Sequence, residues 1–209
     1  MQSNEYDNLN MLNKYLNTSM NELQRFVDKL NKDGLQKALQ LILKAECNHH
    51  RIHVTGIGKP AHVAGYIASL FSSIGTPTYE LSGIEAVHGS SGQVMPGDVV
   101  IAISNSGETK ELQYTVQTLK NNGAQIIAVT GNPSSWLATE SEICLFAGVN
   151  YEGDSLNKPP RTSILAEIIL LQCLSVMLQQ AKNLTIDTYV KWHPGGAIGK
   201  SINETKVRV

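Results

Sequence analysis

The stretch DVVIAISNSGETKEL, residues 98–112, decides how this chain folds. Its apolar and mostly β-branched residues, 99–103, end abruptly at the turn Ser-Asn-Ser-Gly. Apolar residues then recur at helical spacing, as Leu112, Val116 and Leu119. A short and uniformly apolar run is typical of a buried strand in a parallel sheet. The stretch therefore predicts a strand, a turn and a helix in succession.

The turn in this unit carries hydroxyl side chains beside a glycine. Ser104, Ser106 and Thr109 surround Gly107, immediately before the expected helix. The N-terminus of a helix presents unpaired N–H groups and the positive end of the helix dipole, and both favour a phosphate group. A glycine also lets an anion approach the backbone closely. The pattern predicts a phosphate-binding loop, although a helix capped by serine or threonine has the same residues.

A second unit of the same shape lies upstream. Residues 51–55 are strand-like, and the turn GIGKP, 56–60, leads into another helical pattern. The spacing Gly-x-Gly-Lys is too short for a P-loop, and a dinucleotide fingerprint would need a third glycine. Ligands of open α/β sheets bind at the carboxyl edge of the strands. We therefore expect Lys59 at that edge, beside the loop 104–109.

From residue 51 onward, strand and helix patterns alternate along the chain. The expected strands are 51–55, 77–81, 98–103, 125–130 and 142–147. Helices are expected near 60–74, 108–122, 134–139 and 162–182, with a short helical turn near 84–88. Strands separated by helices form a parallel sheet with helices on both faces. The fold class is therefore α/β, with a five-stranded parallel sheet.

The first part of the chain has a different pattern. Apolar residues at spacings of three, four and seven predict one long amphipathic helix over the first thirty residues. Asp33 and Gly34 are expected to break it, and a second helix follows over 35–46. We assign residues 1–46 to helices that pack on the core or on a neighbouring subunit, and residues 47–209 to the α/β core. The chain is effectively one domain.

Composition excludes several classes of protein. The net charge is −1 and the basic residues are scattered, so we expect no nucleic-acid partner and no anionic membrane surface. No apolar stretch reaches the length expected of a membrane span, and the polar N-terminus is unlike a signal peptide. The three cysteines lie far apart in the sequence, which favours reduced thiols. These features indicate a cytoplasmic domain of enzyme size.

Four further polar residues are candidates for chemistry: His88, Glu111, Glu152 and His193. Taken alone, such residues are more typical of solvated carboxylates and of loop histidines that bond to the backbone. Together with a phosphate-binding loop, they fit proton transfer on a phosphorylated sugar, because ring opening and enediolate formation need acids and bases. The sequence contains no redox motif and no metal-ligand cage, so neither a cofactor nor a metal is expected.

Several motifs together resemble one known family. They are GxGK at 56–59, TPTYELSGIEAVHG at 76–89, DVVIAISNSGET at 98–109, VTGNP at 129–133 and HPGGAIGK at 193–200. All are similar to motifs of the sugar isomerase (SIS) domain, over about residues 40–200. The combination of EAxHG with HPGG narrows the resemblance to the arabinose-5-phosphate isomerases of Kdo biosynthesis and their relatives.

The resemblance implies a flavodoxin-like, three-layer αβα sandwich and a homotetramer, a dimer of dimers, with active sites between subunits. It places substrate binding at Gly58, Ser104, Asn105, Ser106, Gly107 and Thr109, and chemistry at Lys59, His88, Glu111, Glu152 and His193. We assign Glu152 as the enediol base and His193 as the acid or base that opens the ring. Lys59 and His88 would position or neutralise sugar oxygens, and Glu111 is the reserve candidate for the base.

Two residues depart from the family's pattern. Pro60 stands where serine is common, which removes one hydroxyl contact. Arg161 brings a new cation toward the helix that borders the site. Long members of the family carry a pair of CBS modules after HPGG, and this chain, which ends at Val209, is expected to be a single-domain form without them.

The expected function is aldose–ketose isomerisation between D-arabinose 5-phosphate and D-ribulose 5-phosphate, through a cis-enediolate. Two alternatives stay open. One is an isomerase of another sugar phosphate, such as a hexulose 6-phosphate, and the other is a non-catalytic module that senses phosphosugars. The presence of both histidines and both glutamates favours chemistry, because a sensor needs only the phosphate-binding loop.

Overall fold

A single parallel sheet organises the chain. The structure is a computed structural model and describes residues 2–195. The strands follow the spatial order β2-β1-β3-β4-β5, and every neighbouring pair is parallel. Their bounds are β1 Ile52–Gly56, β2 Thr78–Ser82, β3 Val99–Ile103, β4 Gln125–Thr130 and β5 Ile143–Phe146. The predicted α/β fold with a five-stranded parallel sheet is therefore confirmed.

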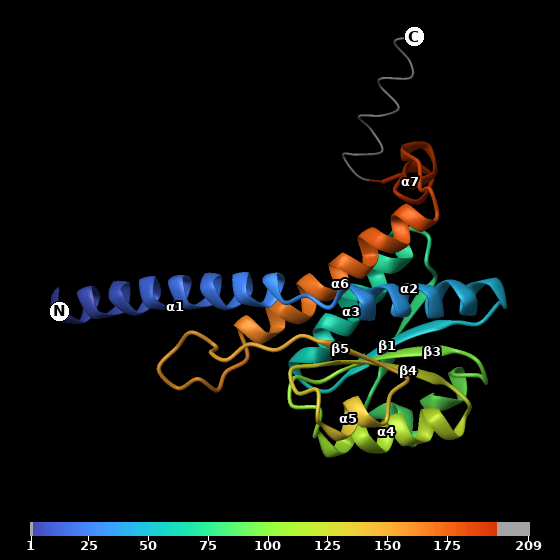
Figure 1. Ribbon diagram of the computed structural model, residues 1–209, viewed down its shortest axis with the longest axis horizontal. Helices are drawn as coiled ribbons and strands as arrows, with labels where there is room; N and C mark the ends of the chain where they lie inside the picture. The colour runs from blue at the N-terminus through green and yellow to red at the C-terminus, as the bar shows by residue number, and fades with distance from the viewer. Residues whose placement is uncertain (1, 196–209) are drawn as a thin grey trace, which may run out of the picture.

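Helices cover both faces of the sheet, so the architecture has three layers (Figure 1). On one face lie α2 (Lys32–Cys47) and α3 (Lys59–Ser73), with α6 (Thr162–Ala181) packed across them. On the other face lie α4 (Lys110–Asn121) and α5 (Trp136–Thr139). Two short 3₁₀ helices, η1 (Glu85–His88) and η2 (Ser90–Gln93), pack beside α4.

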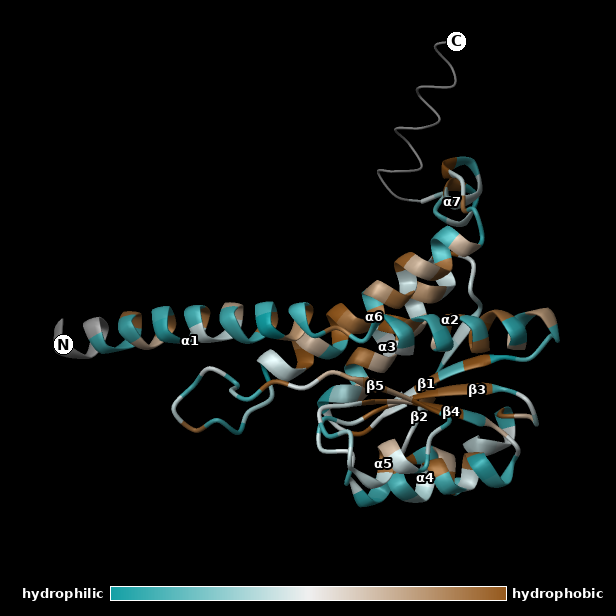
Figure 2. Cartoon of the chain, in the orientation of Figure 1, coloured by the Kyte–Doolittle hydropathy of each residue, from teal (hydrophilic) through white to brown (hydrophobic). Residues whose placement is uncertain are grey.

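The residues of β3 alternate between the cores on the two faces of the sheet. Val99, Ile101 and Ile103 belong to the core under α2, α3 and α6, whereas Val100 and Ala102 belong to the core above α4. All five side chains are fully buried, which explains why this strand is apolar throughout instead of alternating with polar residues. Figure 2 shows the same distribution, with apolar strands at the centre and a hydrophilic outer surface on α4.

The junction of the first two helices differs from the prediction. Helix α1 is Gln2–Asp28 and α2 begins at Lys32, so the break lies at residues 29–31 and not at Asp33 and Gly34. Asn31 caps α2, because its side-chain oxygen accepts a hydrogen bond from the Gly34 N–H at 2.9 Å. Such a cap satisfies a free amide of the first turn, so Asp33 and Gly34 lie inside the helix.

Helix α1 projects far from the body of the molecule at its N-terminal end (Figure 1). The apolar stripe predicted for this helix is exposed over the projecting part, at Leu9, Leu12 and Leu16. Nearer the body, Ser19, Glu22 and Phe26 are buried against the rest of the chain. The C-terminal part of α1 therefore packs on the rest of this chain, whereas the apolar side chains of its N-terminal part face solvent in a single copy.

Helix α6 alone, among residues 2–195, is long and apolar enough to cross a membrane by composition, although the sequence pattern predicted no such stretch. It contacts α1, α2 and α3, and Leu170, Leu171 and Leu174 are buried in the core. A helix that is apolar on most sides is either a membrane span or the central helix of a packed core, and these contacts make α6 a core helix.

The remaining differences from the prediction concern helix starts and short helices. Helix α4 begins at Lys110, with Thr109 as its N-cap, two residues later than expected. Helix α7 (Ile186–Trp192) and η2 were absent from the prediction. Both are short and carry little apolar periodicity, so the sequence pattern gives no signal for them.

Candidate active site

The sheet changes its direction of winding between β1 and β3. The chain leaves β1 toward β2 at one side and leaves β3 toward β4 at the other side. Two turns that diverge from neighbouring strands leave a crevice between them, and ligands of open α/β sheets bind there. Gly56 of β1 is paired with Ile103 of β3, so the Lys59 turn and the Ser104 loop start side by side at this point.

The loop between β3 and α4 folds around its own hydroxyl groups. Ser104 Oγ accepts the Gly107 N–H at 3.1 Å and lies 3.2 Å from Thr109 Oγ1. Ser106 Oγ accepts the Glu108 N–H at 3.2 Å. Thr109 makes no side-chain cap bond to α4. The first amides of α4 therefore remain available for an anion, as at other helix N-termini that bind phosphate.

Gly107 is required by packing underneath this loop. Its φ is +66°, and a Cβ atom placed on it would lie 2.0 Å from Ser135 Oγ. Ser135 is the N-cap of α5, and the Gly107 carbonyl accepts the Leu137 N–H at 3.1 Å. A side chain at position 107 would therefore collide with α5. The glycine is therefore needed for the loop to pack against α5, in addition to any access that it gives an anion on the solvent side.

The turn after β1 is equally tight. A Cβ atom on Gly56 would lie 2.8 Å from the backbone carbon of Pro60, so α3 starts directly over the end of the strand. Gly58 has a φ of +68° and is the N-cap of α3. Lys59, the first helical residue, is exposed and makes no ion pair with any residue between 2 and 195. Its ammonium group is thus free to bind an anion or a sugar oxygen at the crevice.

Glu152 lies in the irregular segment between β5 and α6, and only 8% of its surface is exposed. Its Oε2 accepts the Arg161 N–H at 2.7 Å and the Ser163 N–H at 3.1 Å. Two amide donors at the positive end of a helix stabilise an ionised carboxylate. Glu152 therefore closes the N-terminus of α6 and holds its charge at the carboxyl edge of the sheet.

Helix α1 positions the segment that carries Glu152. Ser19 Oγ lies 2.9 Å from Thr162 Oγ1, and that hydroxyl donates to the Glu152 carbonyl at 3.1 Å. Glu22 Oε2 accepts the Asn150 N–H at 2.7 Å. The sequence pattern assigned α1 only to packing, because it shows no link between residues so far apart in the chain.

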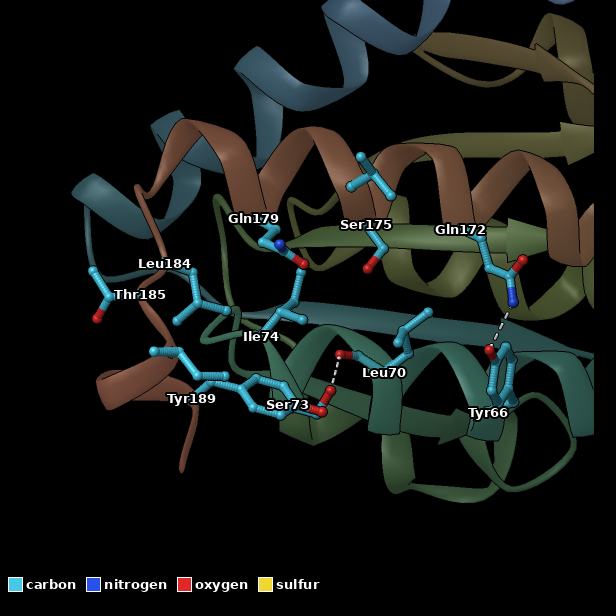
Figure 3. Close-up of a pocket in the computed structure, with 12 residues that line it drawn as sticks. Tyr66, Leu70, Ser73, Ile74, Gln172, Ser175, Gln179, Leu184, Thr185 and Tyr189 are labelled. Carbon is cyan, nitrogen blue, oxygen red and sulfur yellow. Dashed lines mark hydrogen bonds between the residues drawn. The ribbon is translucent and has the colours of Figure 1, made fainter. Parts of the chain in front are cut away.

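A large hollow of the molecule lies away from this crevice. It is a groove of about 660 Å³ between α3, α6 and α7, lined by residues such as Leu70, Gln179 and Tyr189 (Figure 3). The Gln172 amide donates to Tyr66 Oη at 2.8 Å across it. The groove runs toward the C-terminal end of α3, whereas Lys59 lies at the N-terminal end. It therefore belongs to a different surface from the loop of residues 104–109.

Comparison with known proteins identifies the family. The SIS domain matches residues 47–177, which span β1 to β5 and most of α6. The chain belongs to the SIS domain family. Its predicted resemblance to this family is thereby confirmed.

Several relatives of this SIS chain have names that point to sugar phosphates. The arabinose 5-phosphate isomerase of Francisella tularensis is 32% identical over 197 residues, which cover 91% of this chain and 60% of the relative. The enzyme of the same name from Pseudomonas aeruginosa is 37% identical over 170 residues, which cover 81% and 51%. The chain thus spans about half the length of the curated relatives that it matches.

Solved structures show the same fold. The Escherichia coli CFT073 protein c3406, solved in complex with arabinose 5-phosphate, superposes with a TM-score of 0.80 at 29% identity and covers 90% of this chain and 98% of that one. A sugar-phosphate isomerase candidate from Listeria monocytogenes gives a TM-score of 0.82 at 30% identity, with 90% and 96% covered. The three-layer architecture is therefore that of SIS domains.

His193, which the resemblance assigns to the active site, is far from the crevice within one copy of this SIS chain. Helix α6 starts at that edge and is 20 residues long, so it carries the chain about 30 Å away. Trp192 packs on Gly75, just before β2 begins, at the opposite edge of the sheet. His193 Nδ1 donates to the Tyr189 carbonyl at 2.8 Å, which leaves Nε2 with a free lone pair.

Glu111 and His88 lie on elements near β2 and α4. Glu111 is exposed in the first turn of α4, immediately after the loop of residues 104–109. Its carbonyl accepts the Thr115 hydroxyl at 3.1 Å, and that hydroxyl also reaches the Gly83 carbonyl after β2. His88 ends η1, is exposed, and makes no hydrogen bond within the described part of the chain. The structure therefore places Glu111 beside the loop of residues 104–109 and leaves the His88 side chain exposed at the end of η1.

The two departures from the family's pattern have simple structural consequences. Pro60 lies in the first turn of α3, where its missing N–H costs no helical hydrogen bond. The Arg161 side chain pairs with Asp154 in the same loop. Its cation is therefore engaged within the segment between β5 and α6.

Sequence reasoning missed a buried carboxylic acid in α6. Glu167 is fully buried, and burial, together with the charge of Glu152, raises its pKa to about 8. The signal was present in the sequence, because a single glutamate interrupts the apolar run ILAEIILL at 164–171. Charged residues are almost never fully buried without a reason.

A second buried polar pair lies at the opposite edge of the sheet. His53 Nε2 is 3.3 Å from Asp98 Oδ2, and Asp98 also accepts the amides of Arg51 and Met95. Burial lowers the pKa of His53, with Asp98 opposing that shift. These residues fasten the starts of β1 and β3, and we assign them a role in folding.

Proposed function

We propose that this SIS chain is an aldose–ketose isomerase of phosphosugars, with D-arabinose 5-phosphate and D-ribulose 5-phosphate as its favoured pair. The observation that carries the proposal is the crevice at the carboxyl edge. There the open N-terminus of α4 and its hydroxyl loop lie beside Lys59, which makes no ion pair within residues 2–195. Relatives named arabinose 5-phosphate isomerase, and a similar structure solved with arabinose 5-phosphate, support this substrate.

The phosphate would bind to the loop of Ser104, Asn105, Ser106, Gly107 and Thr109. Ser104 and Thr109 already face one another, so one phosphate oxygen can receive both hydroxyl hydrogens. The Asn105 carbonyl accepts the Gly131 N–H at 2.9 Å, which fastens the loop to the turn after β4. A fixed loop pays little ordering cost when it binds an anion.

The chemistry would proceed by proton transfers on the sugar. Glu152 would take the proton from the carbon next to the carbonyl, and His193 would open the ring through its free Nε2. Lys59, next to Gly58, and His88 would hold the sugar oxygens on which negative charge develops. Glu111 is the reserve candidate for the base, because it is exposed beside the loop.

This mechanism needs a second copy of the chain, because His193 lies at the wrong edge of the sheet to reach Glu152 of its own copy. We propose a homotetramer, a dimer of dimers, in which a neighbouring copy supplies His193. Exposed apolar side chains support such contacts on α1, α6 and α7, at Leu12, Met20, Val176 and Ile186. Residues 1–46 would pack partly on residues 47–209 and partly on the neighbouring copy.

The cytoplasm is the compartment that we propose for this chain. Cys47, Cys144 and Cys173 are all free, which is usual where thiols are kept reduced.

Removing the loop hydroxyls tests phosphate binding. The double variant Ser104→Ala, Ser106→Ala is expected to raise KM by roughly ten-fold or more while kcat changes little, because phosphate contributes mainly uniform binding. Steady-state kinetics with D-arabinose 5-phosphate measure both constants. Ser134→Ala, in the exposed turn after β4, is the matched control. An unchanged KM in the double variant would remove this loop from the site.

Mixing two inactive variants tests the shared site. Light scattering should first give a multiple of the 22.8 kDa monomer mass. Glu152→Gln and His193→Ala should each be inactive, but co-expressed chains should regain about a quarter of the wild-type activity if each pair of copies forms two reciprocal sites. An active monomer, or mixed oligomers without any recovery, would contradict the shared site.

A panel of pentose, hexose and heptose phosphates, assayed for isomer conversion, tests the proposed function as a whole. Conversion of D-arabinose 5-phosphate with the highest kcat/KM is the expected result. If the protein prefers a hexulose 6-phosphate, the proposed reaction type would stand and the proposed substrate would be wrong. Binding of a phosphosugar without conversion by the wild-type protein would instead favour a sensing module.

A further inference from the structure

The most unusual group outside the described crevice is the side chain of Glu167 in α6. It is fully buried, and neither of its carboxyl oxygens has a hydrogen-bond partner among the described residues. An ionised carboxylate without partners is far too costly to bury, so such a group stays protonated at neutral pH. The raised pKa of about 8 agrees with this reasoning.

Glu167 lies next to the segment that holds Glu152. Ser163 is one helical turn before Glu167, on the same face of α6, and its N–H donates to Glu152 Oε2 at 3.1 Å. The Ser163 hydroxyl is buried and, like both Glu167 oxygens, has no partner within residues 2–195. Side chains in a helix point toward its N-terminus, which directs the Glu167 carboxyl group toward Ser163.

Glu152 is the charge that acts on Glu167 from outside the helix. Helices α1, α2 and α3 pack against α6, and their described charged residues are exposed, with two exceptions. Glu22 binds Arg25 and the Asn150 amide, and Glu46 binds Lys182. No cation from these helices therefore compensates a charge on Glu167 in the described structure.

We propose that Glu152 and Glu167 form a carboxyl pair that shares one proton, with Glu167 as the protonated member and as a positioning residue for the Glu152 carboxylate. The buried Ser163 hydroxyl, which has no partner within residues 2–195, would accept the Glu167 proton in a hydrogen bond. The pair carries one negative charge, which rests on Glu152 at the α6 N-terminus. Loss of the shared proton places two negative charges in the core and displaces Glu152. This role rests on the proposed function, in which Glu152 is the base.

Infrared spectroscopy tests the pair without relying on activity. Wild-type protein at pH 7 should show the carbonyl stretch of a protonated carboxylic acid, shifted in D₂O, and Glu167→Gln should lose it. The band should disappear from the wild-type spectrum as the pH rises above about 8. A wild-type spectrum without the band, or a Glu167→Gln spectrum that keeps it, would overturn the proposal.

Kinetics then test the positioning role. Glu167→Gln is neutral and can donate a hydrogen bond, so kcat at pH 7 should stay within about two-fold of wild type, and the fall of kcat at alkaline pH should vanish. Glu167→Leu cannot donate, and kcat should drop roughly ten- to hundred-fold with KM unchanged, because small displacements of a catalytic group have effects of that size. Glu46→Gln, which alters a partly buried carboxylate at the other end of α6, should leave kcat and its pH profile unchanged.

The outcomes separate this inference from the proposed function. Equal kcat and pH profiles for Glu167→Gln and Glu167→Leu would show that Glu167 only fills space, and would overturn the positioning role. If Glu167→Gln removes the infrared band but the wild-type protein converts no sugar phosphate, the shared proton would be supported and the proposed isomerase activity would be contradicted.

Discussion

Glutamine in place of Glu152 is expected to lower kcat by roughly two to four orders of magnitude and to abolish exchange of solvent deuterium into the substrate. The substitution keeps an amide oxygen that can still accept the N–H groups of Arg161 and Ser163. The N-terminus of α6 should therefore remain intact, and the lost activity would report the missing base. Proton NMR of D-arabinose 5-phosphate in D₂O measures the exchange directly.

Glu111→Gln is the matched comparison for this prediction. Glu111 is exposed and its described structural contact is made by the backbone carbonyl, so the substitution disturbs nothing that holds the fold. If Glu152→Gln exchanges at the wild-type rate while Glu111→Gln does not, the base is Glu111. Glu152 would then be a capping residue of α6.

Glu167 should make the stability of the wild-type chain fall as pH rises from about 5 to 8. The folded state raises the pKa of this group from 4.5 to about 8. Its favourable contribution to the free energy of unfolding is therefore complete below pH 4.5 and is lost progressively as the pH rises to about 8. Between pH 5 and 8 the unfolded state alone releases the proton, and wild type should lose up to about 4 kcal/mol relative to Glu167→Gln. Urea unfolding of both proteins across this range measures the difference.

Comparing the two proteins at several pH values cancels the constant cost of burying a glutamine amide. Glu167→Leu should show the same change with pH as Glu167→Gln, because both lack the ionisable group. Ser163→Ala should retain most of the wild-type dependence, because it keeps the buried carboxyl group and burial is the main cause of the raised pKa. A difference between wild type and Glu167→Gln that is flat from pH 5 to 8 would mean that Glu167 is ionised normally in the folded chain.

The fold could be predicted largely from local pattern. Buried parallel strands are uniformly apolar and helices repeat every 3.6 residues, so the segments around Val99–Ile103 and α6 were found within a few residues of their bounds. Errors arose where the signal is polar and short. The break before α2 was placed at Asp33 and Gly34 because glycine is a common stop signal, but Asn31 supplies a side-chain cap that lets the helix pass through both.

The candidate site could be predicted only in part, because only some of its residues are brought together by local sequence patterns. Residues that follow β1 and β3 meet because neighbouring parallel strands end at the same edge, and a sequence pattern can express that rule. The position of His193 depends on the length and direction of α6 and on the packing of Trp192 on Gly75, which are tertiary facts.

The sequence by itself determined the strand–turn–helix units, the hydroxyl loop at the N-terminus of α4 and the membership of the SIS family, because each is encoded in residues close together in the chain. The tertiary structure decided the rest. It joined Ser19 and Glu22 of α1 to the Glu152 segment, and it buried Glu167 beside that segment. It also placed His193 at the opposite edge of the sheet from Glu152. These outcomes depend on burial and on contacts between distant segments, and the free energy of a buried charge exists only once the core has formed around it.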